Sequence, residues 1–348
     1  MAKSKGMLES NYFVGIDLGT SRSEIVTEDG IRGVAESVVG WPQDIIGLKV
    51  LGSSIAIGVT ALELREFLEI SFPLENGTIK EGVDRDIEAA EELLKHVISL
   101  ALIPENKKIC GVIGVPAKAS SQSKKILREI AAKQLSQVML ISEPFAIAYR
   151  EERLNNSIIV DMGAGTTNFC AMKGKVPDEN NQESLKKGGN FVDQILLDAL
   201  KHKYPDTQLT INIAKRLKEK YGTVESGADN IVVKLRVKGK LQAHDITEEV
   251  VHACSSFVPN IVEEIERLIM SFDPDFQVEA MKNIVLAGGM SRIKGYPAVI
   301  KEGLSEYGEV NIHIIDDETY GVAEGALKIG NDIPLKYWSQ VGDMEESE

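Results

Sequence analysis

One short pattern occurs twice in this chain and constrains its fold more than any other feature. Residues 14–21 and 159–167 each contain an apolar strand-like run, then Asp-x-Gly, then small hydroxyl residues. Each copy precedes a second strand-like stretch, at 24–27 and 168–172, so each is predicted to form a hairpin with a glycine-rich turn. Two copies in one chain predict two similar lobes.

The length and the later pattern agree with two mixed α/β lobes. A chain of 348 residues exceeds the roughly 250–300 residues at which a single core stops growing. In the first lobe we expect a third strand at 31–38, a helix at 84–100 with Asp84 as its N-cap, a strand at 109–115, a helix after Ser120, a strand at 138–141 and a helix at 143–151.

The second lobe is predicted to repeat this scheme loosely. We expect helices at 191–203 and 213–221, a hairpin at 230–246, one long helix from 247 to about 271 that Pro274 ends, a strand at 283–286, a helix starting near 294 and a last helix at 321–329. Segments 39–79 and 193–254 interrupt the two lobes and are predicted to be inserted subdomains. The acidic tail, 343–348, is expected to be solvated.

Charge and composition exclude several classes of protein. With 39 basic and 53 acidic residues the net charge is −14, which disfavours binding to nucleic acid. The three cysteines have no metal-ligand spacing, which favours a reduced chain without a zinc cluster. Because no apolar run is long enough to span a bilayer, we expect a cytoplasmic protein without direct membrane insertion.

The repeated turns suggest phosphate chemistry. Backbone N–H groups in a turn of glycine and threonine after a buried strand are uncovered by side chains, so a polyphosphate can approach them closely. Asp17 and Asp161, which end the two strands, are suited to Mg²⁺ held mostly through water, and they would lie near each other if the lobes face one another. Taken singly, each Asp-x-Gly-x-Thr pattern is a weak signal that an Asx turn capping a hairpin explains better; the occurrence of two copies favours the phosphate site.

A third glycine turn has a different expected partner. Two consecutive glycines, Gly288 and Gly289, follow a strand, and a flat base or ribose could lie against their backbone because it has no side chains. A turn needed only for packing would show the same sequence pattern. Neither a Walker loop nor a Gly-x-Ser-x-Gly esterase motif occurs in the chain.

These motifs resemble those of the actin-like ATPases, which include actin, bacterial actins, the seventy-kilodalton heat-shock ATPase domain and sugar kinases. Residues 13–21, 158–167 and 284–293 are similar to the first phosphate loop, the second phosphate loop and the adenosine loop, and 111–117 and 321–327 to the two connecting segments. The resemblance implies an α/β, two-lobed fold of duplicated ribonuclease H-like domains. Lobe I would have its core at 11–38, 80–157 and 322–348 with 39–79 inserted, and lobe II its core at 158–192 and 255–321 with 193–254 inserted.

The resemblance also implies a site for ATP and Mg²⁺. Asp17 and Asp161 would hold the hydrated metal, and Glu143 would orient the attacking water, although a Glu before Pro144 is favoured at any helix start. The expected phosphate-cradling residues are Gly19, Thr20, Ser21, Gly163, Gly165, Thr166 and Thr167. The expected nucleoside-side residues are Lys218, Glu219, Gly288, Gly289, Ser291 and Arg292; by themselves, Lys218 and Glu219 are equally typical of a solvated helix face.

One position departs from the pattern of eukaryotic actin. That protein places a lysine on the strand after its first phosphate loop, where this chain has Glu24. Charge neutralisation is therefore expected from Mg²⁺ and backbone amides, which is consistent with slow hydrolysis by positioning alone. The role of Arg22, next to the loop, stays open.

Segments outside the ATP motifs narrow the resemblance. Residues 37–49, 154–161 and 337–343 are similar to the bacterial actins of magnetosome chains. This implies a cytoskeletal ATPase that polymerises with itself into cytoplasmic filaments, with magnetosome-associated proteins as further partners. The alternatives are a small-molecule kinase of the same fold, which would need a base aimed at a bound hydroxyl, and a cell-shape-type bacterial actin.

Overall fold

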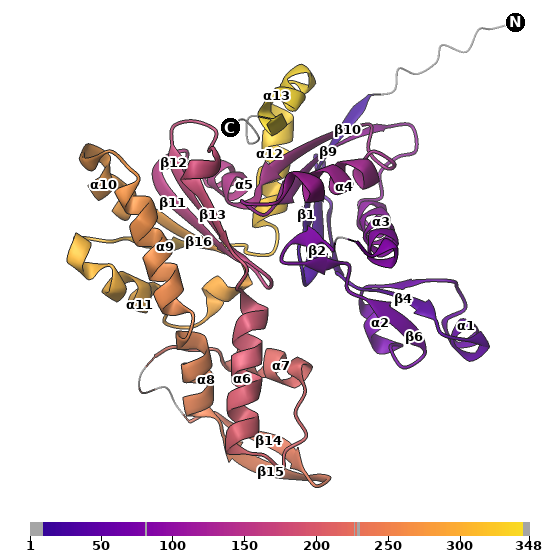
Figure 1. Cartoon of the computed structure of the whole chain (residues 1–348). Coiled ribbons are helices and arrows are strands. Elements are labelled where there is room, and N and C mark those ends of the chain that lie inside the picture. Colours follow the sequence, from indigo (N-terminus) through magenta and orange to yellow (C-terminus); the bar gives the residue numbers. More distant parts are fainter. Residues whose placement is uncertain (1–9, 81, 226, 228–229, 344–348) are drawn as a thin grey trace, which may run out of the picture. The chain divides into compact units, whose positions relative to one another are not determined.

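The computed structural model describes residues 10–80, 82–225, 227 and 230–343. The chain divides into two compact units, Met1–Glu152 with Thr319–Glu348, and Arg153–Glu318 (Figure 1). The predicted acidic tail lies almost wholly outside the described residues. No helix within the described ranges is both long and apolar enough to cross a membrane.

The first unit is built on a five-stranded sheet in the order β10-β9-β1-β2-β3. Strand β1 pairs antiparallel with β2 and parallel with β9. The elements of its core are β1 (Asn11–Leu18), β2 (Arg22–Thr27), β3 (Arg32–Glu36), α3 (Asp84–Ser99), β9 (Lys108–Val115), α4 (Ser121–Ala131), β10 (Gln137–Ser142), α5 (Glu143–Arg150), α12 (Gly321–Asp332) and α13 (Trp338–Asp343).

Alternation along β1 explains why helices cover both faces of this sheet. Val14 and Ile16 are buried in one cluster with residues of α3 and α4. Gly15 faces the opposite way, toward α12, and a Cβ on it would lie 1.9 Å from the carbonyl oxygen of Ala323. The glycine therefore allows the helix to approach the strand closely, and the end of β1 is held from both sides.

The segment 39–79, predicted to be an inserted subdomain, contributes to a small buried cluster beside the main core of the first unit. It contains β4 (Val39–Pro42), α1 (Ile45–Leu51), β5 (Ala56–Ile57), α2 (Val59–Glu63), β6 (Leu68–Ser71), β7 (Leu74–Glu75) and β8 (Thr78–Ile79). Val38, Ala56, Ala61 and Leu68 form this buried cluster. The ring of Trp41 stacks under the guanidinium of Arg85 at 3.5 Å, which attaches this subdomain to α3.

The second unit repeats the topology of the first. Its sheet has the order β13-β12-β11-β16-β17, with β11 antiparallel to β12 and parallel to β16. Its elements are β11 (Asn155–Met162), β12 (Thr167–Lys173), β13 (Gln182–Leu185), α6 (Gly189–Lys203), α7 (Ile211–Tyr221), β14 (Val232–Val237), β15 (Lys240–Asp245), α8 (Thr247–Ser255), α9 (Val258–Met270), α10 (Pro274–Met281), β16 (Ile284–Ala287), α11 (Tyr296–Gly303) and β17 (Ile312–Ile314). The predicted duplication is confirmed.

Proline positions account for the main errors in the predicted elements. The helix expected from 247 to 271 is two helices, α8 and α9, and Pro259 lies in the first turn of α9. Pro274, expected only to end a helix, begins α10. Both outcomes follow because proline lacks an N–H that the first turn of a helix leaves unbonded. Asp84 was wrongly predicted as an N-cap, since Val83 occupies that position without a side-chain bond.

Candidate functional site

The first phosphate turn lies between β1 and β2 in the first unit. The hydroxyl of Ser37 donates a 2.7 Å hydrogen bond to the carbonyl oxygen of Gly19, and its backbone N–H donates to the carbonyl oxygen of Ser21 at 2.9 Å. Asp17, at the end of β1, lies opposite Glu24 across the β1–β2 pair, and Glu24 is buried. Ser37, the residue that follows β3, thus holds the backbone of the turn from one side.

Glu143 and Thr20 approach the same point, the tip of the β7–β8 hairpin. The backbone N–H of Gly77 donates a 2.8 Å hydrogen bond to Oγ1 of Thr20. A Cβ on Gly77 would lie 3.7 Å from Oε1 of Glu143, whose side chain is buried at the start of α5. The predicted water-orienting carboxylate and one predicted phosphate residue therefore neighbour a common backbone segment, which the motif pattern did not predict.

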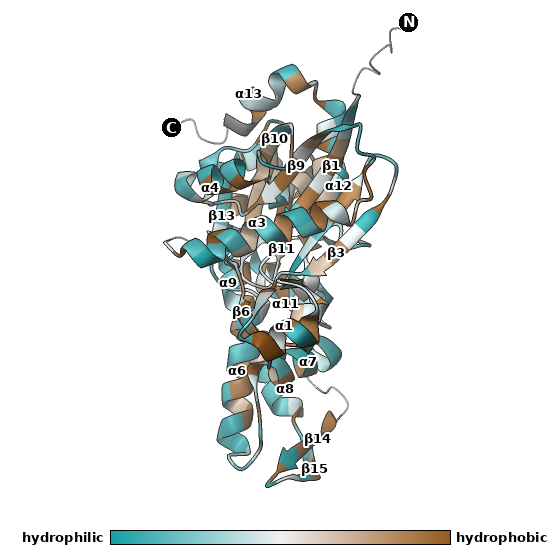
Figure 2. Ribbon diagram, turned by 90° about the vertical axis from the view of Figure 1, so that its right-hand side faces the viewer, coloured by the Kyte–Doolittle hydropathy of each residue, from teal (hydrophilic) through white to brown (hydrophobic). Residues whose placement is uncertain are grey.

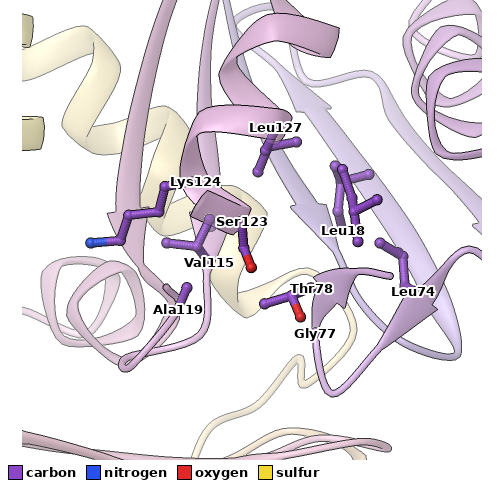
Figure 3. A pocket seen from close by; sticks show the side chains of 11 residues that line it. Leu18, Leu74, Gly77, Thr78, Val115, Ala119, Ser123, Lys124 and Leu127 are labelled. Carbon is purple, nitrogen blue, oxygen red and sulfur yellow. The ribbon is translucent and has the colours of Figure 1, made fainter. Parts of the chain in front are cut away.

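A small cavity lies beside this hairpin, but it is not a nucleotide pocket. Figure 3 shows its lining of mainly apolar side chains at the end of β1, on the hairpin and on α4. Its volume is about 10 Å³, close to the smallest space that accommodates one water molecule. The lining residues are Leu18, Leu74, Gly77, Thr78, Ile79, Gly114, Val115, Ala119, Ser123, Lys124 and Leu127.

The second phosphate turn joins β11 to β12 in the second unit. The backbone N–H of Gly163 donates to the carbonyl oxygen of Thr166 at 2.9 Å, which closes the turn. The first residues of α6 then hold it from outside: N–H of Gly189 donates to the oxygen of Gly163 at 3.0 Å, and N–H of Asn190 to that of Ala164 at 2.8 Å. The turn is therefore tied to a helix start.

The third glycine turn is adjacent to the end of β11. Gly288 has φ of 74°, and a Cβ on it would lie 2.5 Å from the oxygen of Met162 and 2.7 Å from Oδ1 of Asp161. Gly289 faces open space, with no atom within 4 Å of its Cβ position. The buried hydroxyl of Ser291 donates to the oxygen of Gly288 at 2.7 Å. The carboxylate of Asp161 and the backbone of the predicted adenosine turn are thus neighbours, and no side chain separates Gly288 from this carboxylate.

Lys218, one of the predicted nucleoside residues, has partners within the protein. Lys218 is buried, and its Nζ lies 2.8 Å from Oδ1 of Asp193 and 2.9 Å from the carbonyl oxygen of Gly189, whereas Glu219 is exposed. Burial raises the pKa of Asp193 above its ordinary value, against the opposing effect of the Lys218 charge. Lys218 therefore does not lie on a solvated face of its helix, which was the alternative interpretation of this residue.

Arg292 points toward a neighbouring loop of the same unit. Its Nη2 donates to the carbonyl oxygen of Asp316 at 2.6 Å and pairs with the carboxylate of Glu318. The guanidinium therefore braces the segment that follows β17, and the backbone of the glycine turn stays uncovered.

Each unit by itself carries a residue type that fits a hydrated magnesium ion. Asp17 in the first unit and Asp161 in the second each lie at the end of a strand beside a glycine turn, and carboxylate oxygens are the ligands that Mg²⁺ prefers. Across the described residues, no three His, Cys, Asp or Glu side chains form a ready-made metal cluster. A metal held mostly through water needs no such cluster.

Sequence reasoning missed Gly77, Gly188, Gly189 and Asp193. A Cβ on Gly188 would lie 2.6 Å from the carbonyl oxygen of Gly163, so this glycine is needed for the close approach of α6 to the turn. A signal was present, because a double glycine before a helix occurs here as it does at 288–289. Asp193 had no comparable signal.

Comparisons with known proteins agree with this geometry. The model of the MreB/Mbl protein family matches residues 11–336. A protein of Paramagnetospirillum magneticum named actin-like protein MamK is 41% identical over 347 residues, which cover 100% of each chain. The solved structure of a MamK double helical filament has a TM-score of 0.91 and 41% identity, covering 93% of this chain and 100% of that one.

A second solved structure was determined with a nucleotide analogue. It is a non-polymerising mutant of MamK bound to AMPPNP, with a TM-score of 0.74 and 41% identity, covering 93% of this chain and 100% of that one. Together these matches confirm the predicted two-lobed, actin-like α/β fold.

Proposed function

Since this chain belongs to the MreB/Mbl family of actin-like proteins, we propose that it binds and hydrolyses ATP with Mg²⁺ and polymerises into cytoskeletal filaments. The observation that supports this most is the duplicated turn: in each of two units with one topology, a strand ends at an aspartate and runs into a glycine turn, a kind of backbone that suits phosphate oxygens. The AMPPNP bound to a relative that is 41% identical is consistent with it.

In this proposal the chain's own residues bind and orient the reactants. Backbone N–H groups of 19–21 and 164–166 cradle the phosphates, with Thr20, Ser21, Thr166 and Thr167 adding hydroxyls. Asp17 and Asp161 hold water molecules around the metal, and Glu143 orients the attacking water. When bound, Mg²⁺ supplies charge neutralisation along the phosphate chain.

In this proposal the third glycine turn, at 288–292, binds the nucleoside part of ATP. Gly288 and Gly289 offer bare backbone on which a ribose or base can lie, and Ser291 keeps that turn in place through its bond to Gly288. Glu219 and Arg292 are assigned to the edge of this nucleoside-binding region. Lys218 is assigned to the same region, although its ammonium already has protein partners.

Filament formation is proposed from the full-length likeness to a filament-forming relative and from exposed apolar side chains. The helix α1 has a hydrophobic stretch, brown in Figure 2. Its side chains Ile45, Ile46, Leu48 and Val50 are exposed, Ile45 to 81%. On the other unit Met270, Phe276 and Val278 are exposed on and near α10. Two different apolar surfaces on one chain suit a head-to-tail contact that does not close.

We propose a cytoplasmic filament that organises magnetosome chains, with attachment proteins as further partners. This rests on the full-length likeness to the MamK of Paramagnetospirillum magneticum. Paramagnetospirillum magneticum cells that lack their own MamK are expected to regain aligned magnetosomes when they express this chain. Magnetosomes that stay scattered in these complemented cells would contradict this role.

Purified protein tests the core of the proposal. Negative-stain microscopy and sedimentation, with and without MgATP, are expected to show filaments and pelleted protein with the nucleotide, together with release of phosphate. A screen for phosphorylation of sugars by the protein and MgATP distinguishes the proposed filament ATPase from a small-molecule kinase of the same fold. Phosphorylated sugar without filaments would overturn the proposal.

A further inference from the structure

Lys218 and Asp193 form a buried ion pair inside the second unit. Lys218 projects from α7 and Asp193 from the first turns of α6, with Nζ and Oδ1 2.8 Å apart. The two residues are 8% and 1% exposed. Since two charges lose their hydration at such a position, removing one partner leaves the other buried and uncompensated, which is strongly unfavourable.

The pair lies directly behind the second phosphate turn. Nζ of Lys218 also donates to the carbonyl oxygen of Gly189 at 2.9 Å. The N–H of that same residue donates to the oxygen of Gly163 at 3.0 Å. A continuous chain of hydrogen bonds therefore runs from the ammonium through one peptide residue to the turn.

Two glycines allow the close approaches in this chain. A Cβ on Gly188 would lie 2.6 Å from the backbone oxygen of Gly163, which excludes a side chain at this position. A Cβ on Gly189 would lie 2.8 Å from Nζ of Lys218, so a side chain there would displace the ammonium from its place beside the turn.

The end of α7 is braced against the third turn as well. The N–H of Gly222 donates to the carbonyl oxygen of Lys218 at 2.7 Å, and the oxygen of Gly222 accepts from the N–H of Lys294 at 3.1 Å. Lys294 follows the segment 288–292. Lys218 is thus linked by short paths to both turns of this unit and belongs to the segment 193–254 predicted to be an inserted subdomain.

We propose that Lys218 is a positioning residue: paired with Asp193, its ammonium holds the backbone of the second phosphate turn through Gly189 and couples that turn to α7. The ion-pair partner of Nζ, Asp193, and its hydrogen-bond acceptor, Gly189, both belong to the protein, so the ammonium supports the turn. This inference rests on the proposed nucleotide site, since it says how the turn is kept ready for phosphate.

Two single variants and their combination test the proposal. Lys218→Met and Asp193→Asn are each expected to weaken binding of a fluorescent ATP analogue with Mg²⁺ by about tenfold, the factor of one lost hydrogen bond to a charged group. In nucleotide-free protein the amides of 163–166 should exchange with deuterium faster by a similar factor. The double variant should be no weaker than the worse single variant, because the two side chains act as one unit.

A neighbouring lysine provides the matched control. Lys220→Met removes an exposed ammonium from the same helix and should leave both readouts at the wild-type level. If a variant does not fold, Lys218→Arg and Asp193→Glu keep both charges and change only the geometry, and smaller effects of the same sign are expected.

Three outcomes would overturn the inference. A ligand role for Lys218 predicts weaker binding in Lys218→Met but unchanged binding and exchange in Asp193→Asn. A merely structural role predicts lower unfolding stability with unchanged affinity and unchanged exchange at 163–166. If the wild-type chain binds no nucleotide, the proposed function fails, and unchanged exchange in the nucleotide-free variants would then overturn the positioning role separately.

Discussion

The backbone N–H of Gly77 lies 2.8 Å from Oγ1 of Thr20 and donates a hydrogen bond to it. The tip of the β7–β8 hairpin is therefore fastened to the first phosphate turn by a side chain of that turn. Gly77 has φ of 72°, and a Cβ there would lie 2.5 Å from Cγ of Pro116, so no other residue fits this position without strain.

Replacing the Thr20 hydroxyl by a methyl group should loosen this attachment. Thr20→Val is expected to lower the free energy of unfolding by about 1 kcal/mol, the net worth of one hydrogen bond, and to weaken ATP binding. Urea unfolding and analogue titration measure the two effects. Thr78→Val is the control, because the Thr78 hydroxyl donates only to the exposed end of the same hairpin, at Glu75. Equal losses in both variants would contradict a specific role for Thr20.

Glu143 is predicted to act on hydrolysis and not on binding. Glu143→Gln keeps the size of this buried side chain but removes the carboxylate that orients water, so phosphate release should slow by about 10²–10⁴-fold with nucleotide affinity and assembly retained. A phosphate-release assay beside a sedimentation assay separates the effects. Glu129→Gln, at an exposed position of α4, is the control. Near-normal turnover in Glu143→Gln would remove this residue from the mechanism.

Local residue types were enough to predict the glycine turns. Gly19 and Gly163 follow aspartates at the ends of apolar runs, and such a pattern has few structural solutions besides a tight turn after a buried strand. The repetition of the pattern predicted two units of one topology for the same reason. Periodicity and turn chemistry therefore predicted two similar α/β lobes, whereas the actin-like fold itself was implied by the resemblance of the motifs.

Tertiary packing decided what local patterns could not predict. Lys218 looks like part of a solvated helix face, and only the packing of α7 on α6 brings it to Asp193. Likewise Gly77 is an ordinary turn glycine until its hairpin meets Thr20. Pro274 shows the limit of breaker rules, because a proline that was expected to end one helix begins the next one, α10.

The net charge of −14 predicts that filaments need salt. Like-charged subunits repel, and the screening length shortens from about 30 Å at 0.01 M to about 8 Å at 0.15 M ionic strength. Light scattering in MgATP should therefore rise between these two conditions. The same titration with MgADP controls for salt-induced aggregation. Scattering that does not respond to salt would contradict an electrostatic barrier to assembly.

The apolar face of α1 is predicted to be a contact between subunits. Ile45→Asp places a charge on a side chain that is 81% exposed, and an aspartate at the first position of a helix is compatible with its dipole. The pelleted fraction in MgATP should fall while analogue binding persists. Val232→Asp changes an exposed valine on β14 and should still pellet. Equal losses in both variants would indicate a general charge effect.

The pairing of Tyr149 with Asp332 predicts a measurable titration that reports on the contact of α5 with α12. The Tyr149 hydroxyl donates to Oδ2 of Asp332 at 2.9 Å. Burial, then this hydrogen bond and the Asp332 charge, raise the pKa of Tyr149 from 10.0 to about 12. Stability from the protonated phenol is thus complete below pH 10.0 and is lost as the pH rises through about 12. The phenolate absorbance that Tyr149→Phe removes should have its midpoint near 12, and Asp332→Asn should lower that midpoint. Tyr337→Phe, which changes an exposed tyrosine, should leave the absorbance change of Tyr149 near pH 12 in place. If the absorbance change that Tyr149→Phe removes has its midpoint near 10.0, the pairing is contradicted.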